Sequence, residues 1–433
     1  MAMDGKELVE KLAKLSQVQS IKDIPQLTHA LFPGTHCPLM GAAMAVGGIK
    51  NSLIVVVGTD ECTYYTKSMT IHSEKFGGID GRCVSVVLDD HDVTFGSAEK
   101  VQEAFKEIIE EYRPQCVFLV TTCVIEIIGD DFDAISEGLS ELYGIPVLPV
   151  HTEHFKCEDH LPGLERTITV CAEMMKSCDS DNSVNLLGQR MGDFATTELY
   201  AMLQKAGVKI GLQLPCGCSV DDIKNAAAAK VNIVVNDIAL PLAQKMQEKF
   251  GIPYVYFNKF VIPEKIYEAY KNLFGYLELE LPGELEGLYQ NAREKIEKNK
   301  GELEGITYIY GNTPYAVFEM NCFLSSLGMV PQVIQTNRYT EADEPYAKEI
   351  LQYTDPYVCK ADNIAPLQYV YDVLSPYLYL GHEFGNRLRQ KGIAIVHSDR
   401  ASGMLGFEVT GYLLQQLVKS VREAKEYRKE LGL

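Results

Sequence analysis

The chain has 433 residues, of which 46% are hydrophobic, so it is long enough for roughly two to four domains with full-sized cores. Its 40 Lys and Arg residues face 59 Asp and Glu residues, and the net charge of −19 disfavours binding to nucleic acid or to an anionic lipid surface. No apolar run approaches the roughly 18 residues of a membrane span. The start, MAMDGKELVEKLAKL, has the pattern of an amphipathic helix and not of a secretory signal peptide. We therefore expect a cytoplasmic protein with no nucleic-acid or membrane partner.

Short runs rich in β-branched residues alternate with helical stretches along the chain. Most of these runs are apolar on both faces, which is typical of parallel strands covered by helices on both sides. The helical stretches Ala98 to Tyr112 and Leu240 to Phe250 are suited to crossover connections. The predicted strands are Leu53 to Val57, Cys83 to Leu88, Val117 to Thr121, Val147 to Val150, Val184 to Gly188, Lys209 to Leu214, Val231 to Val235, Tyr254 to Phe257, Thr307 to Tyr310, Gln332 to Gln335, Tyr357 to Lys360, Tyr377 to Leu380 and Ile393 to Val396.

Two polar segments divide this pattern. Residues 176–185 are rich in turn formers, and residues 281–305 contain a charged helix with no strand; a fresh strand follows each of them. We therefore predict an α/β fold of three consecutive Rossmann-like units with mostly parallel sheets flanked by helices. The predicted units are residues 1–182, which carry the cysteines described next, residues 183–302 and residues 303–433.

Twelve cysteines are an unusual number for a chain in a reducing compartment, where they indicate metal binding or catalysis rather than disulfides. Cys62 and Cys123 follow the strands that begin at Leu53 and Val117, and the carboxyl ends of parallel strands are where such sheets bind ligands. Cys37 lies just before an apolar helix, whose dipole favours its thiolate. A single one of these thiols is readily explained as a core residue, but three that converge on one edge favour a metal site.

Several other motifs are missing from the sequence. Without a CxxC pair, neither a zinc ribbon nor a ferredoxin-type cluster is indicated. Neither a phosphate loop nor a G-x-G-x-x-G motif is present, so any nucleotide is expected on a partner protein. The lack of G-x-S-x-G and H-E-x-x-H argues against a hydrolase or a zinc protease.

The contexts of the three cysteines resemble those of the nitrogenase component 1 family, which includes nitrogenases and nitrogenase-like reductases. They read Cys-Pro-Leu-x-Gly-Ala, V-V-G-T-x-x-C and T-T-C-x-x-E-I-I-G-D-D. The resemblance implies an iron-sulfur cluster, of the 4Fe-4S or 8Fe P-cluster type, held by Cys37, Cys62 and Cys123 at the interface with a homologous component 1 subunit. It also implies a heterotetramer or homodimer that works with an ATP-hydrolysing iron protein, which accounts for the missing phosphate loop.

The resemblance leaves open whether the chain binds a second cofactor. In this family the nitrogenase α subunit holds its large cofactor through one Cys and one His. His397 lies in a context like that of the cofactor His, but residues 231–240, where the Cys is expected, contain none. Cys216 and Cys218 lie shortly before that segment and are either displaced ligands or small loop residues. A second metallocofactor or a tetrapyrrole substrate is therefore an expectation that rests on these three residues.

The loop after the strand that ends at Val150 reads HTEHFKCEDH and has metal-like spacing. In the family this loop flanks the active cavity, so His151, His154 and His160 are candidate catalytic residues that donate protons or contact the substrate; a polar surface loop is the alternative. We expect His36, beside Cys37, to be a hydrogen-bond donor or a solvent-exposed residue rather than a ligand. The cysteines expected mostly in the core are Cys83, Cys116, Cys171, Cys178, Cys322 and Cys359.

These observations predict the catalytic component of a nitrogenase-like, ATP-dependent two-component reductase, an oxidoreductase that takes electrons from an iron protein through an interfacial iron-sulfur cluster. The alternative is a non-catalytic scaffold for assembly of a nitrogenase-type metallocluster. The compact length is closer to nitrogenase-like tetrapyrrole reductases, whereas the motif TTCVIEIIGDD is closer to nitrogenase β and to the scaffold proteins. A small-ligand binding protein of the periplasmic type, without iron, is a third alternative.

Overall fold

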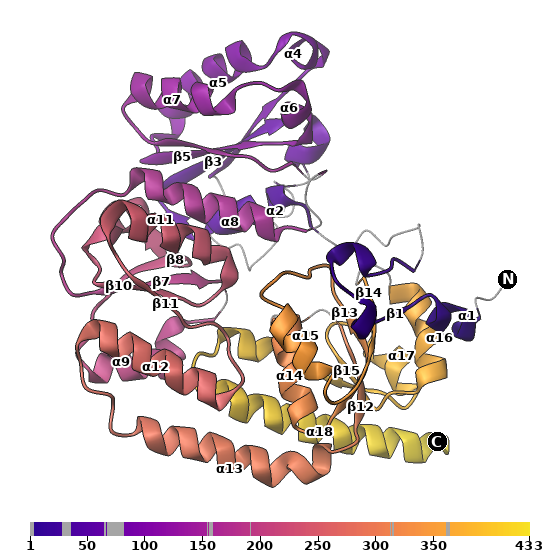
Figure 1. Ribbon diagram of the computed structural model, residues 1–433. Coiled ribbons are helices and arrows are strands. Elements are labelled where there is room, and N and C mark those ends of the chain that lie inside the picture. The colour runs from indigo at the N-terminus through magenta and orange to yellow at the C-terminus, as the bar shows by residue number, and fades with distance from the viewer. Residues whose placement is uncertain are drawn as a thin grey trace.

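The computed structural model describes residues 4–27, 36–64, 66, 82–153, 155, 159–190, 192–311, 313, 316–360 and 364–433. Its α/β architecture confirms the predicted fold class, because three mainly parallel sheets are each flanked by helices (Figure 1). Every strand predicted from the sequence is present within two residues of its expected bounds. The assignment of three units with their bounds stays a prediction.

The first sheet has the order β4-β3-β5-β6, and all of its pairs are parallel. Its two central strands are buried at every position, as expected for strands with helices on both faces. One group of helices covers the outer face, and α2 and α8 cover the inner face (Figure 1). The strands are β3 (Ser52–Gly58), β4 (Cys83–Val87), β5 (Cys116–Thr121) and β6 (Val147–Val150); the helices are α2 (Pro38–Gly47), α4 (Asp90–Phe95), α5 (Ala98–Tyr112), α6 (Cys123–Ile128), α7 (Phe132–Tyr143) and α8 (Leu161–Val170).

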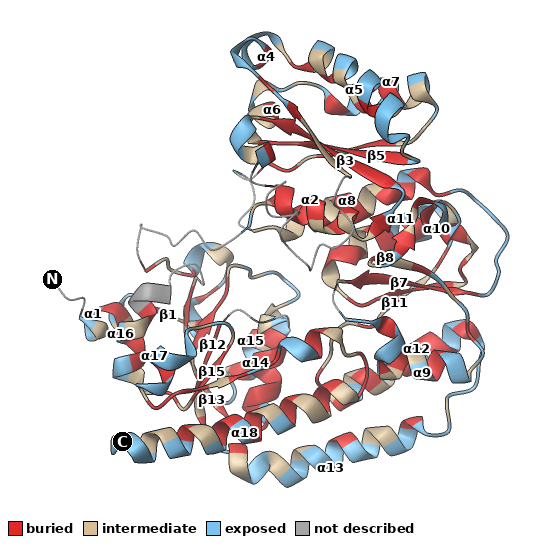
Figure 2. Ribbon diagram, turned by 180° about the vertical axis from the view of Figure 1, so that it is seen from behind, coloured by how far each residue is buried: buried red, intermediate tan, exposed pale blue. Residues whose placement is uncertain are grey.

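The second sheet has the order β11-β10-β7-β8 and is also parallel. It shares one hydrophobic core with the first sheet, built on α2 and α8, whose buried residues lie between the two sheets (Figure 2). A short parallel pair, β2 with β9, joins the same two parts of the chain. The elements are β2 (Ile49–Lys50), β7 (Val184–Gln189), β8 (Ile210–Pro215), β9 (Cys218–Ser219), β10 (Val231–Val234), β11 (Tyr254–Tyr256), α9 (Glu198–Lys205), α10 (Val220–Lys224), α11 (Leu240–Phe250), α12 (Pro263–Leu277) and α13 (Leu285–Leu303).

The third sheet has the order β1-β14-β13-β12-β15-β16, in which only the edge strand β1 is antiparallel. The start of the chain packs here, because β1 pairs with β14 and α1 packs on α16. The amphipathic helix expected at the start therefore ends at Glu10. The elements are α1 (Gly5–Glu10), β1 (Ala13–Lys14), β12 (Thr307–Tyr310), β13 (Val330–Gln335), β14 (Tyr357–Cys359), β15 (Leu378–Leu380), β16 (Ala394–Val396), α14 (Val317–Ser326), α15 (Glu344–Ile350), α16 (Ile364–Leu374), α17 (Gly385–Arg389) and α18 (Glu408–Leu431).

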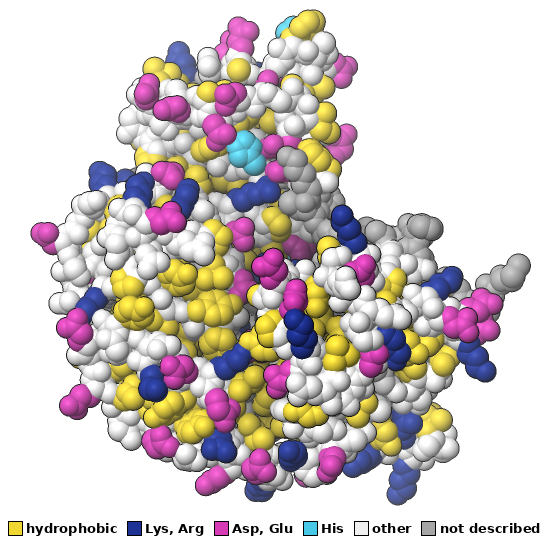
Figure 3. Space-filling model, viewed as in Figure 1, with side chains coloured by type: hydrophobic (Ala, Val, Ile, Leu, Met, Phe, Trp, Pro, Cys, Tyr) yellow, Lys and Arg dark blue, Asp and Glu magenta, His cyan; other side chains and the backbone are white. Residues whose placement is uncertain are grey.

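Short 3-10 turns complete the connections, and one of them, η9 (Asp399–Gly403), borders the second sheet. On the face that Figure 3 shows, Lys and Arg side chains are interspersed with Asp and Glu. Within the described ranges, no helix has both the length and the apolar character needed to cross a bilayer. The remaining 3-10 turns are η1 (Leu15–Gln17), η2 (Ile21–Asp23), η5 (Cys171–Met174), η6 (Phe194–Thr196), η7 (Ala226–Ala228) and η8 (Asp237–Ala239).

Candidate functional site

The three cysteines of the expected cluster site all lie at or near helix starts. Cys37 is the N-cap of α2, with Pro38 at the first helical position. Cys62 lies in the helical residues 60–64 that follow β3, and Cys123 is the first residue of α6, just after β5. All three thiols are half-buried. The carboxyl edge of the first sheet therefore carries Cys62 and Cys123, as the sequence predicts.

The Cys62 thiol is within electrostatic reach of both Cys123 and Cys37. Burial raises the pKa of the Cys62 thiol above its ordinary value, and interaction with Cys123 and Cys37 raises it further, against a lowering hydrogen bond with Thr59. Among the described residues, no three His, Cys, Asp or Glu side chains lie close enough to hold a single metal ion.

Close contact between α2 and α8 fixes the position of Cys37. A Cβ on Gly163 would lie 1.8 Å from the carbonyl oxygen of Pro38, and a Cβ on Gly41 would lie 1.9 Å from that of His160. Only glycine allows the two backbones to come this near. The backbone next to Cys37 is thereby held against the start of α8.

A second close approach lies beside Cys123. Thr122 is the N-cap of α6, and a Cβ on Gly58 at the end of β3 would lie 2.1 Å from its Oγ1. This Oγ1 atom is buried and makes no hydrogen bond in the structure. A buried hydroxyl group without a protein partner can donate a hydrogen bond to a bound ligand. It lies one residue from the Cys123 thiol.

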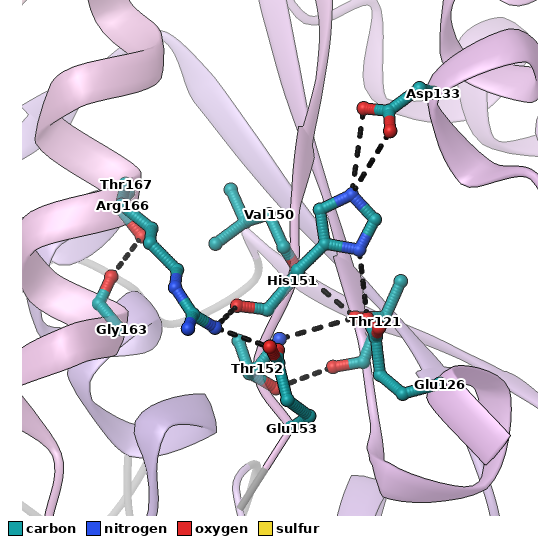
Figure 4. A network of polar contacts seen from close by, with 10 residues as sticks. All are labelled: Thr121, Glu126, Asp133, Val150, His151, Thr152, Glu153, Gly163, Arg166 and Thr167. Carbon is teal, nitrogen blue, oxygen red and sulfur yellow. Dashed lines mark hydrogen bonds and ion pairs between the residues drawn. The ribbon is translucent and has the colours of Figure 1, made fainter. Parts of the chain in front are cut away.

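A polar network connects α6 to the end of β6 (Figure 4). His151 Nδ1 lies 2.9 Å from Glu126 Oε1, and His151 Nε2 lies 3.4 Å from Asp133 Oδ2. Thr121 at the end of β5 also donates to Glu126. The hydrogen bond to Glu126 raises the pKa of His151 to about 8, against the opposing effect of burial.

The same network reaches α8 through Arg166. Its Nη1 atom donates to the backbone oxygen of His151 and to Glu153 Oε2, each at 2.7 Å. His151, a candidate proton donor, is therefore half-buried and engaged on both ring nitrogens as well as on its backbone. Of the other residues in this loop, His154 and Cys157 lie outside the described residues.

His160 lies just before α8, away from this network. Its Nε2 atom is 3.1 Å from Nη2 of Arg190, and its ring meets that of His36 edge to face at 6.5 Å between centroids. Burial, followed by the charge of Arg190, lowers the pKa of His160 to about 4. At neutral pH the imidazole is therefore uncharged and suited to accept a hydrogen bond from the guanidinium.

The sequence did not single out Arg190 and Lys259, which follow β7 and β11 at the carboxyl edge of the second sheet. Cys216 lies at the same edge after β8, and its thiol donates to the backbone oxygen of Arg190 at 3.3 Å. Lys259 donates to the backbone oxygen of Ser402 in η9. Only their position could have indicated these residues in the sequence, because each of them comes shortly after a predicted parallel strand.

The residues considered for a second cofactor do not form a three-ligand group in the part of the chain that the structure describes. Cys218 lies in β9 within the core, where burial raises its pKa to about 12. Cys216 is half-buried, and His397 is exposed, with its backbone oxygen accepting from Tyr412. A cofactor role for Cys216, Cys218 and His397 stays a prediction.

The cysteines expected in the core are mostly there. The exception is Cys178, which is exposed because it lies in the polar segment that precedes β7. Cys83 is half-buried at the start of β4. Fully buried are Cys116, Cys171, Cys322 and Cys359.

Similarity to known proteins covers most of the chain. The model of a family described as nitrogenase component 1 type oxidoreductase matches residues 37–422. The chain is 31% identical over 224 residues to the nitrogenase iron-molybdenum cofactor biosynthesis protein NifE of Clostridium pasteurianum, covering 51% of this chain and 49% of that protein. It is 24% identical over 330 residues to the nitrogenase molybdenum-iron protein alpha chain of Methanosarcina barkeri, covering 72% of this chain and 62% of that one. The matched region thus spans about half the length of the Clostridium relative.

The fold is also similar to that of a solved structure, nitrogenase Cp1 at pH 6.5. The two share a TM-score of 0.77 over 93% of this chain and 95% of that chain, at 15% sequence identity. At this identity the likeness is one of fold.

Proposed function

The chain belongs to the nitrogenase component 1 type oxidoreductases, and on this premise we propose that it is a non-catalytic scaffold on which a nitrogenase-type metallocluster is assembled. The observation that carries the proposal is the position of Cys37, Cys62 and Cys123 at or near helix starts, with the Cys62 thiol within electrostatic reach of the other two. The NifE relative, a cofactor biosynthesis protein by name, supports the scaffold over a catalytic subunit.

Cys37, Cys62 and Cys123 would hold an iron-sulfur cluster through their thiolates. When bound, such a cluster supplies one-electron transfer at a potential set by its surroundings. The chain itself fixes the ligands: the glycine contact between α2 and α8 holds Cys37, and the pair of Glu126 and His151 holds the helix that begins with Cys123. The Thr122 hydroxyl, buried without a partner, is the available donor beside Cys123.

The surroundings of these cysteines support a second component 1 subunit as partner. Tyr64, Phe95 and Ile127 are 71%, 76% and 73% exposed, although large apolar side chains gain from burial. Tyr64 lies two residues after Cys62, Ile127 lies on α6, and Phe95 ends α4, which packs on α6. Exposed apolar side chains on elements that carry or adjoin the half-buried cysteines support a surface for another protein.

Cluster transfer tests the scaffold directly. The chain is purified anaerobically, loaded with radioactive iron and sulfide, and incubated with the apo form of a nitrogenase component 1 protein. We expect the label to move to the acceptor from the wild type and from Cys178→Ser, a matched control at an exposed thiol, but Cys62→Ser should carry little label to transfer. Label that stays on the wild-type chain throughout would contradict the scaffold.

A catalytic subunit of a two-component reductase is the second candidate. It is favoured by the match to the nitrogenase molybdenum-iron protein alpha chain, which extends over 72% of this chain. This function requires an ATP-hydrolysing iron protein as electron donor. Reduction of a small molecule or a tetrapyrrole that depends on iron protein, ATP and reductant, and that is lost in Cys62→Ser but kept in Cys178→Ser, would establish it in place of the scaffold.

A further inference from the structure

We propose that the carboxyl edge of the second sheet, at its contact with η9, binds a small oxyanion, a carboxylate or a phosphate, through Arg190 and Lys259. This site is separate from the three cluster cysteines. The inference goes beyond the proposed function and does not depend on it.

Both cations lie where a parallel sheet binds its ligands. Arg190 is the first residue after β7, and Lys259 follows β11 by three residues. The turn η9 packs against this edge, because Lys259 donates to Ser402 and a Cβ on Gly192 would lie 2.8 Å from the Cα of Gly403. The two cations therefore lie at a junction between loops of the second and third sheets.

Neither cation of this pair forms an ion pair with a carboxylate of the described residues. Among the described residues, no carboxylate comes within 4.0 Å of either cationic group, whereas exposed cations elsewhere on the chain do have such partners. Lys259 bonds to a neutral backbone oxygen, and Arg190 faces the imidazole of His160. Both residues are half-buried, and a charge that has lost part of its water without gaining a counter-charge destabilises a fold unless something else compensates it.

The guanidinium also has an unused donor. Arg190 Nε is buried and has no hydrogen-bond partner, although the Nη2 atom of the same group reaches His160 at 3.1 Å. Asp159 acts on Arg190 through space, but its Oδ1 accepts from the backbone nitrogen of Leu161 at the start of α8. A planar guanidinium with free donors is suited to the two oxygens of a carboxylate or phosphate.

The electrostatics of Lys259 agree with this geometry. Burial, followed by the charge of Arg190, lowers the pKa of Lys259 to about 8. The two cations thus repel each other in a setting that water screens poorly. An anion between them would remove that repulsion and hold Lys259 in its charged form.

The same surroundings favour an anion over a metal cation at Cys216. Its thiol is already used as a donor to the backbone of Arg190, whose guanidinium repels cations, and its neighbour Cys218 faces the core. The described residues therefore fit a second metallocofactor at these two cysteines poorly. An oxyanion needs cationic donors and no thiolate, which is what this edge of the sheet provides.

Titration calorimetry on the full chain tests the site with citrate, with inorganic phosphate and with neutral triethyl citrate. We expect the wild type to bind citrate, phosphate or both, and the neutral ester not at all. Arg190→Gln and Lys259→Gln should each weaken binding at least tenfold. The matched controls Arg293→Gln and Lys419→Gln, at exposed positions, should bind within twofold of the wild type. Binding of citrate alone or of phosphate alone supports the site and identifies the class of anion; no binding of either anion, or unchanged affinity in both site variants, overturns it.

Thermal unfolding gives a second readout that separates ligand binding from structure. Without anion, Lys259→Met should unfold at the same temperature as the wild type or higher, because it removes a half-buried charge that has no ion-pair partner among the described residues. The bound anion should raise the unfolding temperature of the wild type but not of this variant. A variant that unfolds at a lower temperature, together with a wild type that gains nothing from either anion, would give Lys259 a purely structural role and overturn the proposal. If Arg190→Gln fails to fold, Lys259→Gln and Lys259→Met carry the test.

Discussion

The imidazole of His151 and the carboxylate of Glu126 are paired at 2.9 Å, and Glu126 lies on the helix whose first residue is Cys123. Because Thr121 also donates to Glu126, one carboxylate ties together the ends of β5 and β6 and the start of α6. Such a connection fixes the direction of a short helix that has few buried side chains of its own. The position of the Cys123 thiol therefore depends on a pair of residues that are not among the three expected ligands.

This pair predicts a pH-dependent stability. The hydrogen bond to Glu126 raises the pKa of His151 from 6.5 to about 8, so the stabilisation is fully present below about pH 6.5 and is lost as the pH rises through about 8. We expect about 1 kcal/mol of the free energy of unfolding to be lost across this window, a value reduced for the partial exposure of His151. Urea unfolding of the cluster-free protein at several pH values measures it.

Glu126→Gln should abolish this loss and return the pKa of His151 toward its usual value, which the NMR titration of the His151 ring reports. Glu137→Gln, at an exposed position on α7, is the matched control and should behave as the wild type. A pH dependence that survives in Glu126→Gln would show that the pair does not stabilise the fold.

The contact between α2 and α8 predicts that Gly→Ala substitutions at different positions will differ sharply in their effect on stability. Gly41→Ala and Gly163→Ala should each destabilise the protein by about 3 kcal/mol, because the new Cβ overlaps a backbone carbonyl of the other helix. Gly138→Ala on α7 is the control: its new methyl group would have no neighbouring atom within 4 Å, so helix propensity should stabilise the fold by up to about 1 kcal/mol. Denaturant unfolding gives all three values, and equal effects at Gly163 and Gly138 would contradict the close helix contact.

Thiol reactivity should separate the cysteines by their surroundings. Burial raises the pKa of Cys116 and of Cys218 to about 12, so at about pH 8 only about one such thiol in 10,000 is ionised. We expect iodoacetamide to modify the exposed Cys178 first and to leave Cys116 and Cys218 intact in the folded protein. Peptide mapping by mass spectrometry identifies the sites. Early modification of Cys116 would mean that the first sheet opens far more readily than its packing indicates.

The long strands could be predicted from the sequence because they carry their own signal. Runs such as Leu53 to Val57 are apolar at every position, and the structure buries them on both faces. The strands β1, β2 and β9 were not predicted, since each has two residues and exists only through a partner far along the chain. The same reason explains the start of the chain, where pairing of Ala13 with Val358 ends the expected helix early.

Some residues of the candidate sites could likewise be predicted from the sequence, and others could not. Cys37, Cys62 and Cys123 could be predicted because their contexts resemble a known family and because strand ends place two of them at one edge. Arg190 and Lys259 could not, since a single Arg or Lys after a strand is usually a solvated residue. Their proposed role rests on the lack of an ion-pair partner among the described residues around them and on the unpartnered Nε of Arg190. Only the three-dimensional structure reveals these features.

The central claim is that Cys37, Cys62 and Cys123 together hold an iron-sulfur cluster. The most direct measurement is the iron and acid-labile sulfide content, with the electron paramagnetic resonance spectrum, of anaerobically purified wild type, Cys62→Ser and Cys178→Ser. We predict a brown wild type with iron, sulfide and a cluster signal, an unchanged Cys178→Ser, and a Cys62→Ser that loses most of the iron or changes its spectrum. A folded wild type without iron, or a Cys62→Ser with the iron content and spectrum of the wild type, would contradict the claim.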